Sequence, residues 1–168
     1  PRHADLFDAD SLVKAAEGSQ VVVHVATAIP KKRDITPSDW LGNDRVRREG
    51  TEALTECAGR IGASLYLHQS VVWVARPSGG ASFDEESPTH TNQIMNSAID
   101  AEATARQAEA RFGFKTAILR CAWFYSADSF QTRLCAEYLF HRRLPIVGGG
   151  DSILSLIHPD DVADAFAR

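Results

Sequence analysis

The sequence predicts an α/β fold built on a doubly wound, mostly parallel sheet. Three apolar runs rich in branched side chains carry this prediction: VVVHVA at residues 21–26, SLYLHQSVVWVA at 64–75 and KTAILRCAWFY at 115–125. Continuous runs of this kind are typical of strands that helices cover on both faces. Helical patterns separate the runs, and this alternation of strand and helix indicates right-handed crossover connections in one sheet.

Helices are predicted from capping residues and from the spacing of apolar side chains. The first begins at Asp8 or Asp10, whose carboxylate caps free N–H groups, and Gly18 ends it. The second has a charged outer face, NDRVRRE, and the Ala-rich third stops at Gly113. The predicted helices cover residues 8–17, 40–60, 94–112 and 129–142, and a last one starts at 158–160.

Gly, Ser and Pro mark the connecting segments. The stretch ARPSGGASFDEESPTHT, residues 75–91, is a loop by composition. LPIVGGGDSILSLI, residues 144–157, predicts a small hairpin with Gly148–Gly150 at its turn. We find no internal repeat and no second domain, so residues 1–168 are expected to form a single α/β domain.

Composition excludes several classes of function. The 168 residues carry a formal net charge of -4, whereas proteins that neutralise nucleic-acid phosphates usually carry the opposite sign. No apolar run approaches the roughly 20 residues that span a bilayer, and no basic-then-apolar leader starts the chain. The three cysteines match no metal ligand set. These observations predict a cytoplasmic protein without a metal, a nucleic-acid partner or a membrane partner.

Four segments resemble, in order, those of the extended short-chain dehydrogenase/reductase family, the NAD-dependent epimerase/dehydratases. ADLFDADSLVKAAEGSQVVVHVAT looks like the acidic turn, helix and fourth strand of that family, and SLYLHQSVVWVA is similar to its fifth strand. KTAILRCAWFY resembles the strand that enters the substrate domain, and LPIVGGGDSILSLIHPDDVADAF resembles the stretch that ends in an H-V-D-D-V-A helix start. The resemblance implies a sheet of Rossmann type, with the segment at 144–157 on the substrate side.

The resemblance also implies roles for individual residues. Ser70 lies in or beside the position of the catalytic Ser or Thr, with Val71 as the competing alignment. The residues that match cofactor-binding positions of the family are Asp5, Leu6, Ala26, Thr27, Gln69 and Cys121. Of these, the acidic turn at Asp5 would meet the adenine ring, and the small residues after the fourth strand would let the backbone approach NAD or NADP.

A Gly-rich turn for the cofactor's pyrophosphate does not occur in the chain. A dinucleotide site needs such a turn between its first strand and the following helix, because the free N–H groups of that helix hold the phosphates. Neither G-x-G-x-x-G nor G-x-x-G-x-x-G is found. We therefore expect an incomplete sheet whose phosphate-binding segment precedes Pro1 in a longer parent protein, and tight NAD or NADP binding only by that parent.

The family's proton-transfer Tyr and its Lys four residues later are also missing. The Tyr position falls on Met95 or Asn96 and the Lys position on Ile99 or Asp100, according to the register. The residues four after the three tyrosines are Ser70, Ser129 and Arg142, so the chain holds no Tyr-x-x-x-Lys pair. The proton donor of any reaction therefore has no candidate of the usual kind.

Other titratable groups give two further expectations. Asp100 and Glu102 are expected on a solvated helix face, although desolvation of either carboxylate would make it a base. His24 and His68 lie in adjacent apolar strands, where the two rings could approach each other, and the expected role of each is a hydrogen-bonded core residue, with a metal ligand or a base as the alternative.

These observations together predict an NAD(P)-dependent oxidoreductase that acts on a hydroxyl- or carbonyl-bearing small molecule, with a nucleotide sugar as one candidate. Ser70 would orient the reacting oxygen. The missing Tyr and Lys favour an alternative, a non-catalytic NAD(P)-binding regulator or sensor of the same fold. The resemblance further implies a homodimer that pairs the helices at residues 40–60 and 94–112.

Overall fold

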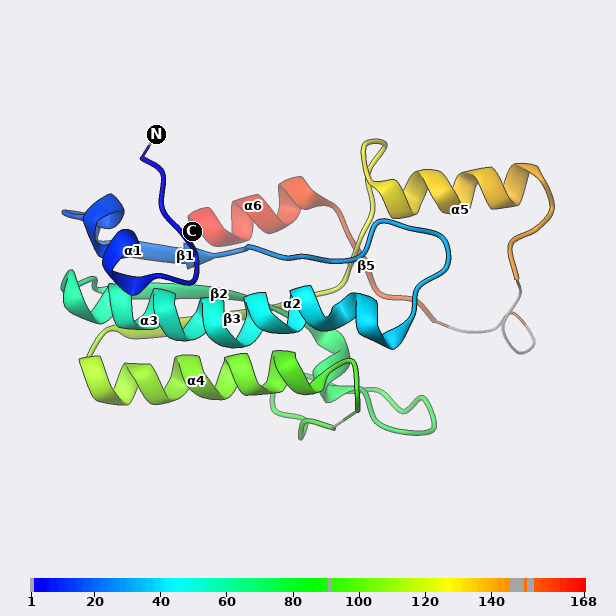
Figure 1. Ribbon diagram of the computed structural model, residues 1–168. Coiled ribbons are helices and arrows are strands. Elements are labelled where there is room, and N and C mark those ends of the chain that lie inside the picture. Colours follow the sequence, from blue (N-terminus) through cyan, green and yellow to red (C-terminus); the bar gives the residue numbers. More distant parts are fainter. Residues whose placement is uncertain (1, 91, 146–149, 151–152) are drawn as a thin grey trace. The chain divides into compact units, whose positions relative to one another are not determined.

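The computed structural model describes residues 2–90, 92–145, 150 and 153–168. The chain divides into two compact units, residues 1–120 and 121–168. The first unit holds the sheet β1-β2-β3, made of Val21–His24, Leu65–Val71 and Lys115–Cys121, of which the last residue, Cys121, already belongs to the second unit (Figure 1). Its helices and turns are α1 (Ala9–Ala16), η1 (Pro37–Trp40), α2 (Leu41–Arg45), η2 (Val46–Gly50), α3 (Thr51–Arg60), η3 (Val72–Ala75) and α4 (Asn96–Phe112).

The three strands of the first unit run in the same direction. β1 and β2 pair in parallel, with His24 opposite His68. The starts of β2 and β3 also lie together, because the Lys115 N–H donates to the Ser64 carbonyl at 2.9 Å. The predicted α/β class with a parallel sheet is therefore confirmed.

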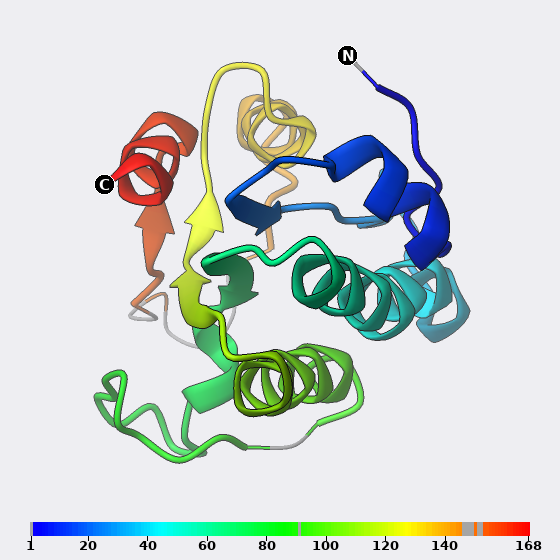
Figure 2. The ribbon, with the colours of Figure 1, turned by 90° about the vertical axis from the view of Figure 1, so that its left-hand side faces the viewer.

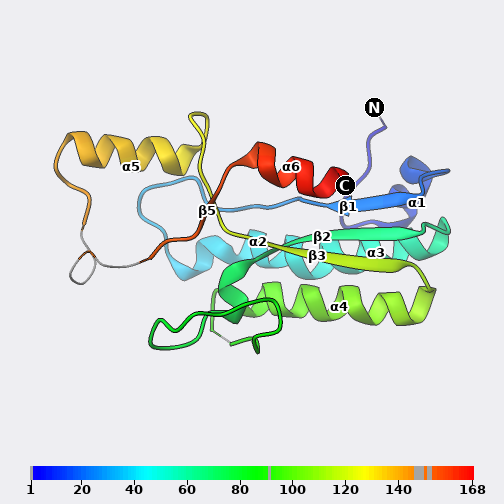
Figure 3. The same cartoon turned by 180° about the vertical axis from the view of Figure 1, so that it is seen from behind.

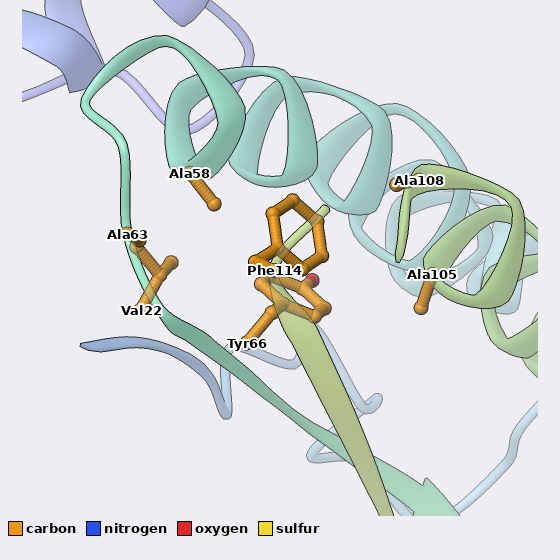
Figure 4. Packing of buried hydrophobic residues seen from close by; sticks show 7 residues of the cluster. All are labelled: Val22, Ala58, Ala63, Tyr66, Ala105, Ala108 and Phe114. Carbon is orange, nitrogen blue, oxygen red and sulfur yellow. The ribbon is translucent and has the colours of Figure 1, made fainter. Parts of the chain in front are cut away.

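Helices α3 and α4 lie side by side on one face of this sheet (Figures 2 and 3). A small apolar core fills the space between them and the strands, with Tyr66 and Phe114 at its centre (Figure 4). The other face of β1 differs from the expectation that both faces are covered, because Val21 and Val23 are each 44% exposed. β1 is also one of the two edge strands of this sheet, so apolar side chains are exposed at that edge.

Local signals placed most helix ends correctly. The Asp8 carboxylate caps α1 by accepting from the N–H groups of Asp10 and Ser11. Gly113 ends α4 in the left-handed conformation, at a φ of 82°. The predicted helix at 40–60 is confirmed as one continuous run of helical backbone, in which the π-helical turn η2 separates α2 from α3 and the 3-10 turn η1 leads into α2. The predicted strand at 64–75 ends at Val71, and a 3-10 turn follows it.

The second unit contains β4 (Trp123–Phe124), α5 (Phe130–Phe140), β5 (Leu156–Ile157) and α6 (Pro159–Ala167). The expected hairpin at 144–157 is wrong for its last strand, because β5 pairs in parallel with β4. The Trp123 N–H donates to the Ser155 carbonyl and the Tyr125 N–H to that of Ile157, which fixes this pairing. Residues 146–149 and 151–152 of the segment, including most of the Gly148–Gly150 turn, lie outside the described residues.

Candidate functional site

The carboxyl edge of the parallel sheet gathers most of the residues predicted for a site. Ala26 and Thr27 follow the end of β1 and are exposed, while Gln69 and Ser70 lie at the end of β2. Cys121 is the last residue of β3 and is buried. Ligands of open α/β sheets bind at this edge, and the roles of these residues stay predictions.

Ser70 is buried in a polar network on the face that α4 covers. Its hydroxyl donates to Oε1 of Glu102 on α4 at 2.5 Å. Arg120 of β3 donates two hydrogen bonds to the same carboxylate, from Nε to Oε1 at 3.0 Å and from Nη2 to Oε2 at 2.7 Å. Gln69, the neighbour of Ser70 in the strand, points to the opposite face by the alternation of β-structure. The three side chains of Ser70, Glu102 and Arg120 thus form one hydrogen-bonded unit, named below the Ser–Glu–Arg network.

The expectation that Glu102 lies on a solvated face is wrong, since its side chain is only 5% exposed. Burial raises the pKa of its carboxyl group, but the hydrogen bonds from Arg120 and Ser70 outweigh burial and hold that pKa below the usual value. Glu102 is therefore ionised at neutral pH and is a weak base. Its partner Arg120 went unnoticed in the sequence, although an Arg inside the apolar strand at 115–121 signals a buried ionic partner.

The hydroxyl of Ser70 has a restricted chemistry in this network. Its proton points at an ionised carboxylate, so the hydroxyl oxygen is left as an acceptor toward a substrate. The alternative position, Val71, carries no polar group. Ser70 can therefore orient a donor group of a substrate, whereas protonation of a substrate oxygen would first break its bond to Glu102.

The N-terminal part of α4 holds no replacement for the missing Tyr and Lys. Asp100 is exposed and forms an ion pair with Arg48 at 2.7 Å, as expected for a solvated face. Ser97 is buried and accepts from Arg47 at 3.3 Å. Burial raises the pKa of Tyr66, the tyrosine of the core, well above its usual value, so this phenol holds its proton tightly.

The acidic turn lies before α1, far along the chain from Ser70. Oδ1 of Asp5 accepts from the Phe7 N–H at 2.9 Å, and the Asp5 N–H donates to the Ser11 hydroxyl. Leu6 packs against Gly50, where an added Cβ would lie 3.1 Å from the Leu6 side chain. The turn is therefore rigid and its carboxylate is partly used by its own backbone.

Two expectations about metals and membranes can be compared with the structure. Among the described residues, His, Cys, Asp and Glu side chains form no group of three that could hold a metal ion. In the same part of the chain, we find no helix with the length and apolar character that crossing a membrane requires.

Comparison with known proteins matches the chain to a family. The model of the NAD dependent epimerase/dehydratase family matches residues 2–168. A curated relative from a Streptomyces species, the 3-diazoavenalumate denitrifying reductase, is 28% identical over 169 residues, which cover 96% of this chain and 56% of the relative. The chain thus spans little more than half the length of that relative.

Solved structures give the same fold. The dTDP-glucose 4,6-dehydratase DesIV of Streptomyces venezuelae, with NAD bound, has a TM-score of 0.78 at 23% identity, over 98% of this chain and 52% of that one. The UDP-glucuronic acid 4-epimerase of Bacillus cereus, in complex with UDP-glucuronic acid and NAD, has a TM-score of 0.76 at 21% identity, over 97% and 52%. The UDP-glucose 4-epimerase of Thermus thermophilus, complexed with NAD, has a TM-score of 0.75 at 19% identity, over 99% and 58%.

Proposed function

The chain belongs to the NAD dependent epimerase/dehydratase family. We propose that it is part of a nicotinamide-dependent reductase whose hydride transfer does not use a Tyr–Lys proton donor. The Ser–Glu–Arg network is the observation that carries this proposal. It occupies the carboxyl edge of the sheet, where this family of folds binds its ligands, and it commits the hydroxyl proton of Ser70 to an ionised carboxylate.

The residues after β1 suit a nicotinamide dinucleotide. Ala26 and Thr27 are small and exposed, so a flat cofactor could approach the backbone there. The next residue is held in place, because the Ala28 N–H donates to Oδ1 of Asn43 at 3.0 Å. A bound NADH or NADPH would supply the hydride. The contribution of the chain's own residues is to hold the loop and to fix Ser70.

The reaction that suits this site needs no proton at the substrate. Reduction of a carbonyl creates an alkoxide that a general acid must protonate. Near Ser70, Glu102 is ionised, and burial lowers the pKa of His68 to about 4, so its ring is neutral at pH 7. We therefore favour an acceptor that is already cationic or electron-poor over a hydroxyl- or carbonyl-bearing one.

The name of the Streptomyces relative supplies an acceptor of this kind, a diazo group. An aryl diazonium cation takes up one hydride and gives an arene and dinitrogen. The new C–H bond replaces the C–N bond, the hydride supplies the electron pair that neutralises the positive charge, and no proton enters. We propose a small molecule that bears an aryl diazonium group as the substrate class, and nucleotide sugars are the comparison substrates.

The test uses the intact protein that contains these residues, with NADH and NADPH supplied separately. The cofactor is deuterated at C4 of its nicotinamide ring, and the substrate is 3-carboxybenzenediazonium. Deuterium is expected on the substrate carbon that loses dinitrogen, and the rate of this transfer should be well above the rate with heat-denatured protein. Ser70→Ala should lower kcat less than tenfold, because the hydroxyl gives up no proton.

Three other outcomes would contradict the proposal. Rapid turnover of UDP-glucose or UDP-glucuronic acid would show that nucleotide sugars are the substrates. Tight cofactor binding with no turnover of either substrate class would favour the non-catalytic regulator or sensor. Failure of the intact protein to bind either nicotinamide in calorimetry would reject both readings. Pairing into a homodimer through residues 40–60 and 94–112 remains a proposal, which light scattering would test.

A further inference from the structure

A pocket of about 520 Å³ lies in the first unit, just past the carboxyl end of β2. Its apolar lining comes from four residues on η3, the loop after it and the approach to α4: Trp73, Pro77, Ile94 and Met95. The polar lining includes Arg76 and His90. The volume falls in the range of pockets that hold small molecules, about 300–1,000 Å³.

The pocket has a fixed frame on both sides. The His90 N–H donates to the Val74 carbonyl at 2.7 Å, which ties the returning loop to η3. Oδ1 of Asn92 accepts from the N–H groups of Ile94 and Met95, each at 3.0 Å, which fixes the entry into α4. A ligand would therefore meet a preformed wall and would lose less affinity to ordering the protein.

The charge of the pocket is positive. Arg76 is exposed, and among the residues that the structure describes its guanidinium has neither an ion pair nor a hydrogen bond. Among the residues that the structure describes, the lining contains no Asp or Glu. An unpaired guanidinium next to apolar walls favours a carboxylate, whose two oxygens match its planar donors.

A second pocket of about 500 Å³ beside α1 lacks this character. Asp8 and Asp10 contribute carboxylates to its lining, and its Arg2 already donates to the carbonyls of Lys14 and Ala15 at 3.3 Å. The pocket beside α1 is therefore not suited to an anion, although it is similar in size. The pocket at Arg76 differs from it in having a guanidinium without a partner in the described part of the chain.

We propose that the pocket at Arg76 binds a small aromatic carboxylic acid. Arg76 pairs with the carboxylate, and the ring packs against Trp73 and Met95, since aromatic and thioether groups make favourable contacts with a ring. The proposal rests on the proposed function, because it names the substrate class of that reductase as aromatic acids. Trp73 is three residues after Ser70 in the chain, so both belong to the end of β2 and its continuation.

Calorimetry with trans-cinnamate on the intact protein, without any cofactor, tests this site. Arg76→Ala is expected to weaken binding about tenfold or more, and Arg76→Lys to recover part of the loss, because the charge returns without the planar fork. Arg106→Ala is the matched control, since Arg106 is also exposed but lies outside the pocket. The neutral probe cinnamamide should bind the unaltered protein about tenfold more weakly than cinnamate does.

Equal affinity of the Arg76→Ala and Arg106→Ala variants would overturn the proposal, as would equal binding of acid and amide. Displacement of cinnamate by UDP-glucose in an Arg76-dependent manner would assign the guanidinium to a phosphate and would also overturn it. Because no cofactor is present, Arg76-dependent binding of cinnamate alongside failed hydride transfer would reject the proposed function alone. Hydride transfer that is indifferent to Arg76 would reject this site alone.

Discussion

His24 and His68 occupy paired positions on the parallel strands β1 and β2, with their ring centroids 5.2 Å apart and the rings steeply inclined to each other. Both are buried. The expected approach of the two rings is confirmed, but their expected hydrogen bonding is incomplete. Within the described residues, neither ring nitrogen of His24 and not Nδ1 of His68 has a hydrogen-bond partner.

This pair makes stability depend on pH. Burial lowers the pKa of His24, and burial together with the neighbouring His24 lowers that of His68 to about 4; Glu102 opposes the shift and Arg47 adds to it. Below about pH 6.5 the unfolded chain binds protons that the folded chain refuses, so stability is complete above that pH and falls as the pH drops toward about 4. For His68 alone, the loss in free energy of unfolding is about 3 kcal/mol.

Urea unfolding between about pH 7.5 and about pH 4.5 measures this loss. The variant His68→Gln should show a shallower pH dependence, whatever its stability at neutral pH, because one titrating ring has gone. His3→Gln, which alters an exposed residue, should follow the unaltered protein. A slope that is the same in all three proteins would show that the buried pair does not titrate with folding.

Removal of one charged partner from the Ser–Glu–Arg network should lower the free energy of unfolding strongly. Arg120→Ala leaves the buried Glu102 carboxylate without its cation, and we expect a loss of about 3 kcal/mol in the free energy of unfolding. The double variant Glu102→Gln with Arg120→Gln should recover part of that loss, because the buried charge is removed as well.

The ion pair between Arg48 and Asp100 is the matched control. Its N···O distance is also 2.7 Å, but the two side chains are 44% and 54% exposed. Arg48→Ala should therefore cost less than about 1 kcal/mol in the same urea titration. An equal loss in the free energy of unfolding for Arg120→Ala and Arg48→Ala would show that burial does not strengthen the contribution of the network to stability.

Exposure also separates the three cysteines. Cys57 and Cys121 are buried, and burial raises the pKa of both thiols, whereas Cys135 is exposed on α5. Under native conditions, a thiol reagent such as DTNB should react quickly with Cys135 and much more slowly with Cys57 and Cys121. Mass spectrometry identifies the modified residue, and Cys135→Ser should abolish the fast phase. Early modification of Cys57 instead would mean that α3 opens readily.

The parts of the fold that depend on local chemistry could be read from the sequence. Asp8 and Gly113 act on their own helix ends, and His158 begins α6 by accepting from the Asp160 N–H at 3.3 Å. Where the chain's partners are distant, the sequence was less informative. The end of β2 at Val71 and the pairing of β5 with β4 follow from packing and from hydrogen bonds to remote segments, which an apolar run does not encode.

The candidate site shows the same division. The order of strands was enough to bring Ala26 and Ser70 to one edge of the sheet, because parallel strands share their carboxyl ends. The burial of Glu102 was missed, since helical spacing says which face a residue is on but not that Arg120, 18 residues later, neutralises it there.

The close contact of α3 with α4 depends on Gly59. A Cβ added at this position would overlap the Phe112 ring, so the ring or the helix must move. We expect Gly59→Ala to lower the free energy of unfolding by about 1–3 kcal/mol, the usual cost of overpacking. Gly42→Ala is the control, because its added Cβ would meet the Ala28 Cβ at an ordinary 3.8 Å and Ala suits a helix better than Gly. Thermal unfolding should therefore place Gly59→Ala below the unaltered protein and Gly42→Ala at or above it, and the reverse order would show that α3 and α4 do not pack at Gly59.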